Sequence, residues 1–200
     1  WGGHLSFKTP MLMALGAVSM FIIGGISGVM HASVPGDTQH QDSYFVVAHF
    51  HYVLFGGSIF GLFGGIYYWF PKITGKMYHE LLGKVHWALM LIGFNVTFFP
   101  MHWVGILGQP RRTATYDAGL GWTIWNQIET LGTFILVLGF LIFIVNVWLS
   151  LTLGEKAPAD PWDGATLEWT IPSPPPVYNF AHIPLVTNRV PFWAEKYPEV

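Results

Sequence analysis

The sequence predicts an all-α fold, a polytopic bundle of transmembrane helices followed by an irregular, Pro-rich C-terminal tail. Hydrophobic residues make up 52% of the 200-residue chain and charged residues only 10%, which is a membrane-protein composition. Four apolar segments are each long enough to cross about 30 Å of hydrocarbon. After Gly154 the sequence becomes polar and rich in proline, which predicts the tail.

Short connections join the four predicted spans, so neighbouring helices should run antiparallel. Thr9 and Pro10 mark the start of the first span, because proline is favoured in the first helical turn. Asp42 is a good N-cap for the second span. Gly108 ends the third span and Gly154 ends the fourth. The predicted spans cover about residues 11–33, 43–70, 86–107 and 127–153.

The chain divides into a helical part, residues 1–153, and a tail, residues 154–200. The prolines at 174–176 favour an extended polyproline conformation. We therefore expect the tail to lie on the membrane surface or on a partner, at the cytoplasmic side, instead of folding as a domain. Because the chain begins at Trp1 and has no signal-peptide pattern, we expect it to be a fragment of a longer protein.

The charges of the connections predict the orientation in the membrane. The connection 71–83 carries lysines and is expected on the cytoplasmic side, whereas 34–41 has no Lys or Arg and is expected outside. Arg111 and Arg112 then fall on the outer side, against the positive-inside rule. Arginine is the preferred partner of carboxylates, so a cofactor with carboxylates near the outer surface would explain the pair. The alternative is two solvated arginines near lipid phosphates.

The second span contains two histidines, His49 and His51, in the sequence VVAHFHYVL. In an α-helix residue i+2 is turned by about 200°, so the two imidazoles face opposite sides and cannot bind one ion together. Ionisable groups inside a membrane are usually functional, which favours two separate cofactors with the helix between them. The alternative is that each imidazole hydrogen-bonds a neighbouring helix. Both histidines lie roughly 10 Å inside the outer end of the helix, close to the two arginines, and this arrangement fits two hemes.

Composition excludes several classes of function. The chain has no cysteine, which excludes disulfides, thiolate metal sites and cysteine-ligated iron–sulfur clusters. Its formal net charge of −2 gives no basis for a nucleic-acid partner. Redox chemistry would therefore depend on histidine, carboxylate or a bound cofactor.

Several motifs carry a resemblance to a known family. DSYFVVAHFHYVLFGG, residues 42–57, resembles the tenth helix of subunit I of cytochrome c oxidase, in the heme–copper oxidase superfamily. GQPRR, residues 108–112, resembles the family's GMPRR loop, with Gln109 in place of methionine. WGGHL resembles the loop before the ninth helix, and DPW, LEW and PPP resemble the tail of bacterial members. The chain is thus similar to a C-terminal fragment with helices nine to twelve plus the tail.

The resemblance implies a role for five residues near the motif. His49 would be the catalytic-site ligand, binding the iron of the high-spin heme at the oxygen-reducing centre. His51 would bind the iron of the low-spin heme as one of its two axial ligands. Phe50 would lie between the hemes, and Arg111 and Arg112 would pair with their propionates.

The resemblance also implies metals beyond heme iron. Asp42 would belong to a magnesium site at the interface with subunit II, with Asp37 close by. Gln41 stands where many members have a histidine ligand of that magnesium, and His40 is out of register and is expected to be an ordinary surface histidine. The hemes would be two hemes A. Copper would be ligated by residues outside this chain, so the chain alone is expected to be inactive.

The function implied is part of the catalytic subunit of a terminal respiratory oxidase. Such an enzyme transfers electrons from cytochrome c through the low-spin heme to the heme–copper centre, and it reduces oxygen to water while pumping protons. The expected partners are the rest of subunit I, subunits II and III, cytochrome c and membrane lipid, in the bacterial plasma membrane more than the mitochondrial inner membrane. The tyrosine after the second histidine, Tyr52, resembles the pattern of the cytochrome c-oxidising branch of the family more than that of the quinol-oxidising branch. The alternatives are a quinol oxidase, a nitric oxide reductase relative, or a non-redox four-span protein with structural histidines.

Overall fold

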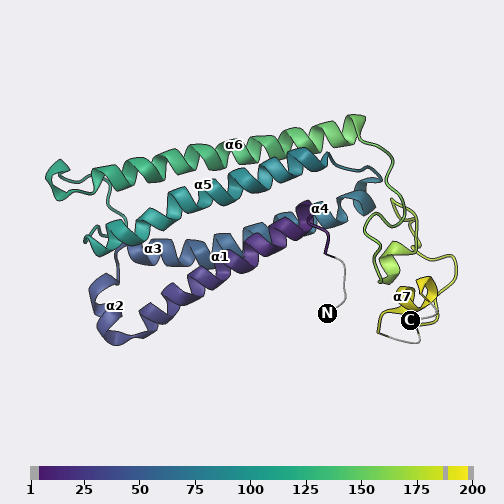
Figure 1. Ribbon diagram of the computed structural model, residues 1–200, viewed down its shortest axis with the longest axis horizontal. Coiled ribbons are helices and arrows are strands. Elements are labelled where there is room, and N and C mark those ends of the chain that lie inside the picture. Colours follow the sequence, from purple (N-terminus) through teal and green to yellow (C-terminus); the bar gives the residue numbers. More distant parts are fainter. Residues whose placement is uncertain (1–4, 187–188, 198–200) are drawn as a thin grey trace. The chain divides into compact units, whose positions relative to one another are not determined.

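The computed structural model describes residues 5–186 and 189–197, and it is helical over most of this length (Figure 1). Within those ranges no β-strand forms, and extended pairing is limited to the isolated bridges Ser43–Pro110 and Lys76–Lys156. The motif WGGHL falls outside the described residues except for Leu5. The predicted all-α class is confirmed.

Four helical stretches are long and apolar enough to cross a membrane, each with 24 to 31 residues. The second is continuous from Tyr44 to Thr74 but consists of two α-helices joined by a π-helix, η1. The predicted number of four spans is therefore confirmed. The bounds are α1, Thr9–Ala32; α3, Tyr44–Phe50; η1, His51–Ile59; α4, Phe60–Thr74; α5, Glu80–Ile106; and α6, Thr123–Leu153.

The third long helix, α5, begins at Glu80, before the apolar stretch predicted from residue 86. Its first turn is polar, so hydrophobicity alone does not reveal it. The Glu80 carboxylate accepts a hydrogen bond from the backbone N–H of Thr9, 2.8 Å away at the start of α1. An acidic side chain in the first helical turn is also favoured by the helix dipole. The polar turn therefore belongs to α5 and joins it to α1.

The residue that caps α3 is Ser43, so the prediction that Asp42 is the N-cap is wrong by one position. The Ser43 hydroxyl accepts a hydrogen bond from the backbone N–H of Phe45 at 3.2 Å. Ser43 has the extended backbone that an N-cap needs (φ −96°, ψ 175°), whereas Asp42 lies in the left-handed region at φ 55°. The Asp42 side chain instead points to solvent and lies 3.9 Å from Arg111.

Small residues allow the helices to approach closely, as is common in membrane bundles. A Cβ added to Gly105 of α5 would overlap the backbone nitrogen of Phe45 in α3. A Cβ added to Gly24 of α1 would lie 2.9 Å from the backbone nitrogen of Val53 in η1. The second membrane helix therefore contacts α1 on one side and α5 on another. Close contacts of the same kind join α5 and α6 at Gly93 and Gly132.

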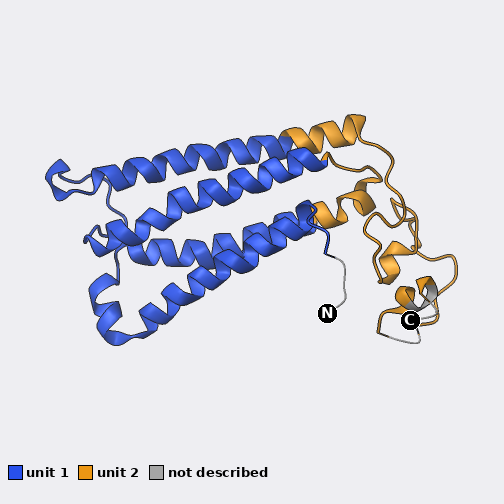
Figure 2. Cartoon of the chain, in the orientation of Figure 1, with its two compact units in different colours: residues 1–65, 80–144 blue, residues 66–79, 145–200 orange. Residues whose placement is uncertain are grey.

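The chain forms two compact units (Figure 2). Unit 1 consists of residues 1–65 and 80–144, and unit 2 consists of residues 66–79 and 145–200. In unit 1 the connection 34–41 is mostly helical, as α2 (Val34–His40), and not an open loop. Whether residues 1–153 and 154–200 act as separate parts of the protein stays a prediction.

In unit 2 the tail packs around Lys72, near the end of α4. The Lys72 ammonium donates hydrogen bonds to the carbonyl oxygens of Ala159 and Ile171, at 2.8 and 2.7 Å. It also lies 5.2 Å from the ring centre of the buried Trp169, in the short helix η3 (Leu167–Trp169). Lys72 is only 5% exposed, so it is not a solvated loop lysine. A second short helix, α7 (Pro191–Lys196), lies further along the tail.

Candidate functional site

His49 lies in the last turn of α3 and faces α1. Its Nδ1 atom is 3.0 Å from the carbonyl oxygen of Gly24 and 3.0 Å from the hydroxyl of Ser27. Gly28 lies directly against the ring, because a Cβ there would be 3.0 Å from Cε1 of His49. A glycine at this position therefore gives the imidazole room to lie along α1.

His51, the first residue of η1, faces α5. Its Nδ1 atom is 2.7 Å from the carbonyl oxygen of Val47, one turn earlier in the same helix. Its ring stacks on Phe98 of α5, with ring centres 4.2 Å apart. His49 and His51 thus contact different neighbouring helices. The ring of Phe50, between them in sequence, lies 4.6 Å from that of His51.

The hydrogen bonds of the two imidazoles assign their tautomers. In each ring Nδ1 lies within hydrogen-bond distance of a backbone carbonyl, which can only accept, so Nδ1 carries the proton. The lone pair is then on Nε2, and no hydrogen bond joins either Nε2 to another described residue. Metal-binding histidines typically donate their other ring N–H to a carbonyl in this way. Both rings are therefore in the form that ligates iron, and the residues present fit heme.

The π-helix η1 is a feature of the site that the sequence did not predict. It begins at His51, where the carbonyl of Val47 bonds both the backbone N–H and the imidazole of His51. Side-chain bonding to the carbonyl four residues earlier competes with regular helix geometry, and Gly56 and Gly57 lower the resistance to a wider turn. The histidine and the two glycines are the features of the sequence that could have predicted the π-helix. Segments of π-helix often occur at functional sites. The α-helical rotation of about 100° per residue, from which the sequence predicts opposite faces for the two histidines, therefore applies only up to Phe50.

The arginine loop is fixed to the start of the helix that carries both histidines. The backbone N–H of Tyr44 donates to the carbonyl of Gln109 at 3.0 Å, and that of Arg111 donates to the carbonyl of Asp42 at 2.8 Å. The ion pair between Arg111 and Asp42 is long, 3.9 Å, and exposed, so it contributes little stability. The Arg111 guanidinium is therefore not strongly bound to a protein carboxylate. Arg112, next in the loop, has φ 65°.

Gln109, the substitution in the arginine loop, is buried and pairs with Asn126 of α6. The Gln109 amide donates to Asn126 Oδ1 at 3.2 Å, and the Asn126 amide donates back to Gln109 Oε1 at 2.8 Å. A methionine could not form this pair. The amide at position 109 therefore ties the loop to α6 while its carbonyl holds α3.

His40 is not a surface histidine, so that prediction is wrong. It is 7% exposed on α2, and its ring stacks on Phe45 with centres 4.4 Å apart. His31 at the end of α1 lies 4.4 Å from His40 and 5.0 Å from His49, measured between ring centres. The reason is that residues 34–40 wind as a helix, which turns His40 back toward α1 and α3.

Tyr52 links η1 to α5 through a buried hydrogen bond. It is fully buried, and its hydroxyl donates to Asn95 Oδ1 at 2.7 Å. Tyr52→Phe would leave that oxygen without its donor, so we expect the free energy of unfolding to fall by about 1–2 kcal/mol. Thermal unfolding of the purified membrane complex measures the change. Tyr178→Phe, at a 70% exposed position, is the control, and equal shifts in both variants would contradict the role of the bond.

Residues 1–135 match the family model described as cytochrome c and quinol oxidase polypeptide I. Cytochrome c oxidase subunit 1 of Bacillus sp. (strain PS3) is 50% identical over 197 residues, which cover 98% of this chain and 32% of that protein. Its counterpart in Synechocystis sp. (strain ATCC 27184 / PCC 6803 / Kazusa) is 50% identical over 186 residues, covering 93% and 33%. The chain thus spans about a third of the length of the curated relatives it matches.

The fold is also similar to a solved chain of a heme-copper terminal oxidase dimer, determined by cryo-EM. The TM-score is 0.66 over 77% of this chain and 28% of that chain, at 23% sequence identity, so this likeness speaks for the fold alone. Four helices of membrane-crossing length agree with an integral membrane protein. With relatives at 50% identity along nearly its whole length, the chain belongs to the subunit 1 family of cytochrome c and quinol oxidases.

Proposed function

We propose that the chain is part of the catalytic subunit of a terminal respiratory oxidase. That enzyme would transfer electrons from cytochrome c through a low-spin heme to a heme–copper centre and reduce oxygen to water with proton pumping. The observation that supports this most is the pair His49 and His51. They lie on one helix and contact different neighbours, and in each ring the Nδ1 proton is bound to a carbonyl so that Nε2 is available.

Each residue of the site has a separate task in this proposal. His49 would hold the high-spin heme iron and His51 the low-spin heme iron. The carbonyls of Gly24 and Val47 keep the two rings oriented and keep Nε2 deprotonated. The aromatic face of Phe98 shields the His51 ring from water. When bound, the hemes supply electron transfer and, at the high-spin centre, oxygen binding.

The arginine loop would offset the charge of the heme propionates. Arg111 and Arg112 follow directly on residues that are hydrogen-bonded to the start of α3, so the loop lies at the same end of the helix as the histidines. A buried carboxylate without a partner is strongly unfavourable, and arginine can bind one through two hydrogen bonds. Phe50, beside the His51 ring, would lie between the two hemes.

Several components of this function would come from outside the chain. Copper would be held by the rest of subunit I, and subunits II and III, cytochrome c, oxygen and membrane lipid complete the system. We propose heme A for both hemes, a magnesium ion near Asp42, and the bacterial plasma membrane as the location. The 200-residue chain alone is then inactive as an oxidase.

A reduced-minus-oxidised optical spectrum of the native membrane complex, with and without carbon monoxide, tests the proposal. We expect one low-spin signal and one high-spin signal that shifts with carbon monoxide. His49→Ala should remove the carbon monoxide-sensitive signal, and His51→Ala should remove the low-spin signal. His182→Ala, at an exposed position in the tail, should leave both unchanged. Absence of heme signals, or signals untouched by either of the first two substitutions, would refute the assignment.

A quinol-oxidising enzyme is the second candidate, because the family that matches includes quinol oxidases. The two candidates differ in the electron donor and not in the histidine pair. Oxygen uptake by the purified complex with reduced cytochrome c, compared with uptake with a reduced quinol, distinguishes them. Turnover with the quinol alone would favour the second candidate.

A further inference from the structure

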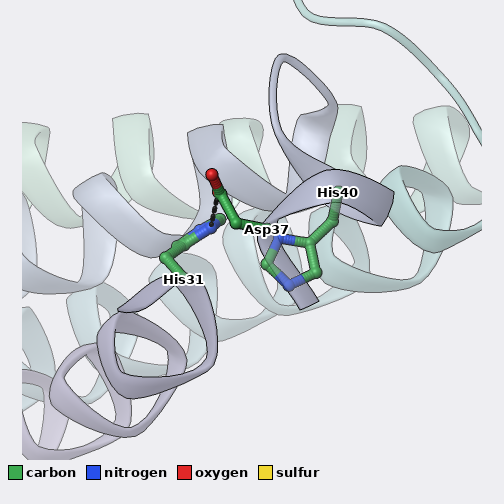
Figure 3. Close-up of side chains that lie close together, drawn as sticks. All are labelled: His31, Asp37 and His40. Carbon is green, nitrogen blue, oxygen red and sulfur yellow. Dashed lines mark ion pairs between the residues drawn. The ribbon is translucent and has the colours of Figure 1, made fainter. Parts of the chain in front are cut away.

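Three side chains of metal-binding type lie together where α1 ends and α2 begins (Figure 3). His31 is in the last turn of α1, and Asp37 and His40 are three residues apart on α2, so these two can face the same side. One ligand atom from each residue lies within 4.8 Å of the other two. We propose that His31, Asp37 and His40 form a binding site for a divalent transition metal ion, with zinc as the representative ion.

Three of the four imidazole nitrogen atoms of this cluster lack hydrogen-bond partners among the described residues. Among the described residues, Nε2 of His31 and both ring nitrogens of His40 are buried and form no hydrogen bond. His40 as a whole is 7% exposed, and its ring lies against the ring of His31. Buried polar atoms are nearly always satisfied, so these three nitrogens need an explanation. A metal ion takes one nitrogen from each imidazole, so a bound ion accounts for one of the two unsatisfied nitrogens of His40.

The donor set selects the class of ion. Two imidazoles with one carboxylate suit zinc and similar transition metals, whereas magnesium prefers oxygen ligands and keeps most of its waters. Ligands in tetrahedral zinc sites are about 3.4 Å apart, given bond lengths of about 2.0–2.1 Å. Nδ1 of His31 and Oδ1 of Asp37 are already 3.5 Å apart. Closing the remaining separations requires side-chain movements of roughly one ångström.

The surroundings leave one side of the cluster open. Phe45 stacks on the ring of His40 and holds it in place, whereas the Asp37 side chain is 48% exposed. An ion can therefore enter from the Asp37 side and keep a water molecule as its fourth ligand. The cluster shares no residue with the sites proposed for heme and magnesium, and the ring of His31 lies 5.0 Å from that of His49. Nδ1 of His49 is bound to Gly24 and Ser27, and the Asp42 carboxylate lies toward Arg111.

Zinc binding by the purified full complex tests the site. After treatment with a chelator and dialysis against micromolar zinc with millimolar magnesium, elemental analysis should find one more zinc per complex in the wild type than in His31→Ala or His40→Ala. Asp37→Asn should weaken zinc binding at least tenfold, because one ligand loses its charge. His182→Ala, an exposed histidine in unit 2, should bind zinc like the wild type.

The heme spectrum of each variant shows whether the complex has assembled, so a folding defect is distinguished from loss of the site. If a histidine variant fails to assemble, Asp37→Asn decides the question, because its exposed side chain can change without leaving a cavity. Cobalt then serves as an optical probe, and its intense tetrahedral absorption should appear in the wild type and be lost in this variant. Equal metal uptake by the wild type and the assembled variants, or displacement of zinc by magnesium, would overturn the proposal. Neither result depends on which electron donor the enzyme uses.

Discussion

The variant Gly105→Ala is expected not to accumulate as an assembled complex. A Cβ at this position in α5 would overlap the backbone nitrogen of Phe45 and lie 2.8 Å from its Cα. Backbone atoms cannot move aside as a flexible side chain can, so α3 and α5 would have to separate. Phe45 is one turn from His49 on the same helix, and separation would displace His51 from the ring of Phe98 in α5 on which it stacks. We expect the free energy of unfolding to fall by about 3 kcal/mol or more, which is at the upper end of the range for overpacked sites.

The yield of complex with both heme signals, together with its thermal unfolding, measures this effect. Gly25→Ala in α1 is the matched control, because a Cβ there would have no atom within 4 Å. Alanine is the better helix former, so the control should be as stable as the wild type or slightly more stable. Similar yields of the two variants would show that α3 and α5 are not in close backbone contact.

The second large effect is expected for Lys72→Met. Methionine keeps the length of the side chain but removes the ammonium that binds the carbonyls of Ala159 and Ile171. Hydrogen bonds to charged groups contribute about 1.5–3 kcal/mol each. We therefore expect the free energy required for local opening of the tail to fall by about 2–4 kcal/mol. The histidine site lies in unit 1 and should be unaffected. The variant should therefore keep its heme signals.

Limited proteolysis of the tail in the detergent-solubilised complex detects the change. Where cleavage follows the population of the open form, a change of this size accelerates it roughly 30- to 1,000-fold. Lys84→Met is the control, because Lys84 is 45% exposed and its pairing with Glu80 is 3.8 Å long. Unchanged proteolysis in Lys72→Met would show that the tail does not depend on this lysine.

The fold was predictable because a membrane imposes simple requirements on sequence. Each span needs a long apolar segment, and four such segments are plain in the sequence. The start of α5 was not predictable from hydrophobicity, because the turn at Glu80 is stabilised by a hydrogen bond to Thr9, 71 positions away. The burial of Lys72 by the tail was missed for the same reason. Contacts between distant segments decide these features.

For the candidate site, the sequence predicted the histidine pair and the family but not the backbone conformation around the pair. The spacing of His49 and His51 predicted that they face different sides, and the motifs predicted a family to which the chain belongs. The capping of α3 by Ser43, the π-helix and the burial of His40 depend on backbone conformations that no single residue reveals. The roles of the histidines and arginines toward heme stay predictions until the spectra are measured.

The π-helical segment also has a consequence for how related sequences are aligned. Residues 51–59 form hydrogen bonds over five positions instead of four, so removal of one residue, such as Gly57, would let the segment close into ordinary α-helix. His49 lies before the segment and would stay in place, and the side chains of α4 would largely keep their directions, because the greater rotation per residue of an α-helix offsets the lost residue. Gly64, where a Cβ would lie 3.4 Å from Met13 of α1, would still face α1. A gap placed here in an alignment therefore signifies the loss of the wide turn, and two homologues that differ by it can share the same partners along α4.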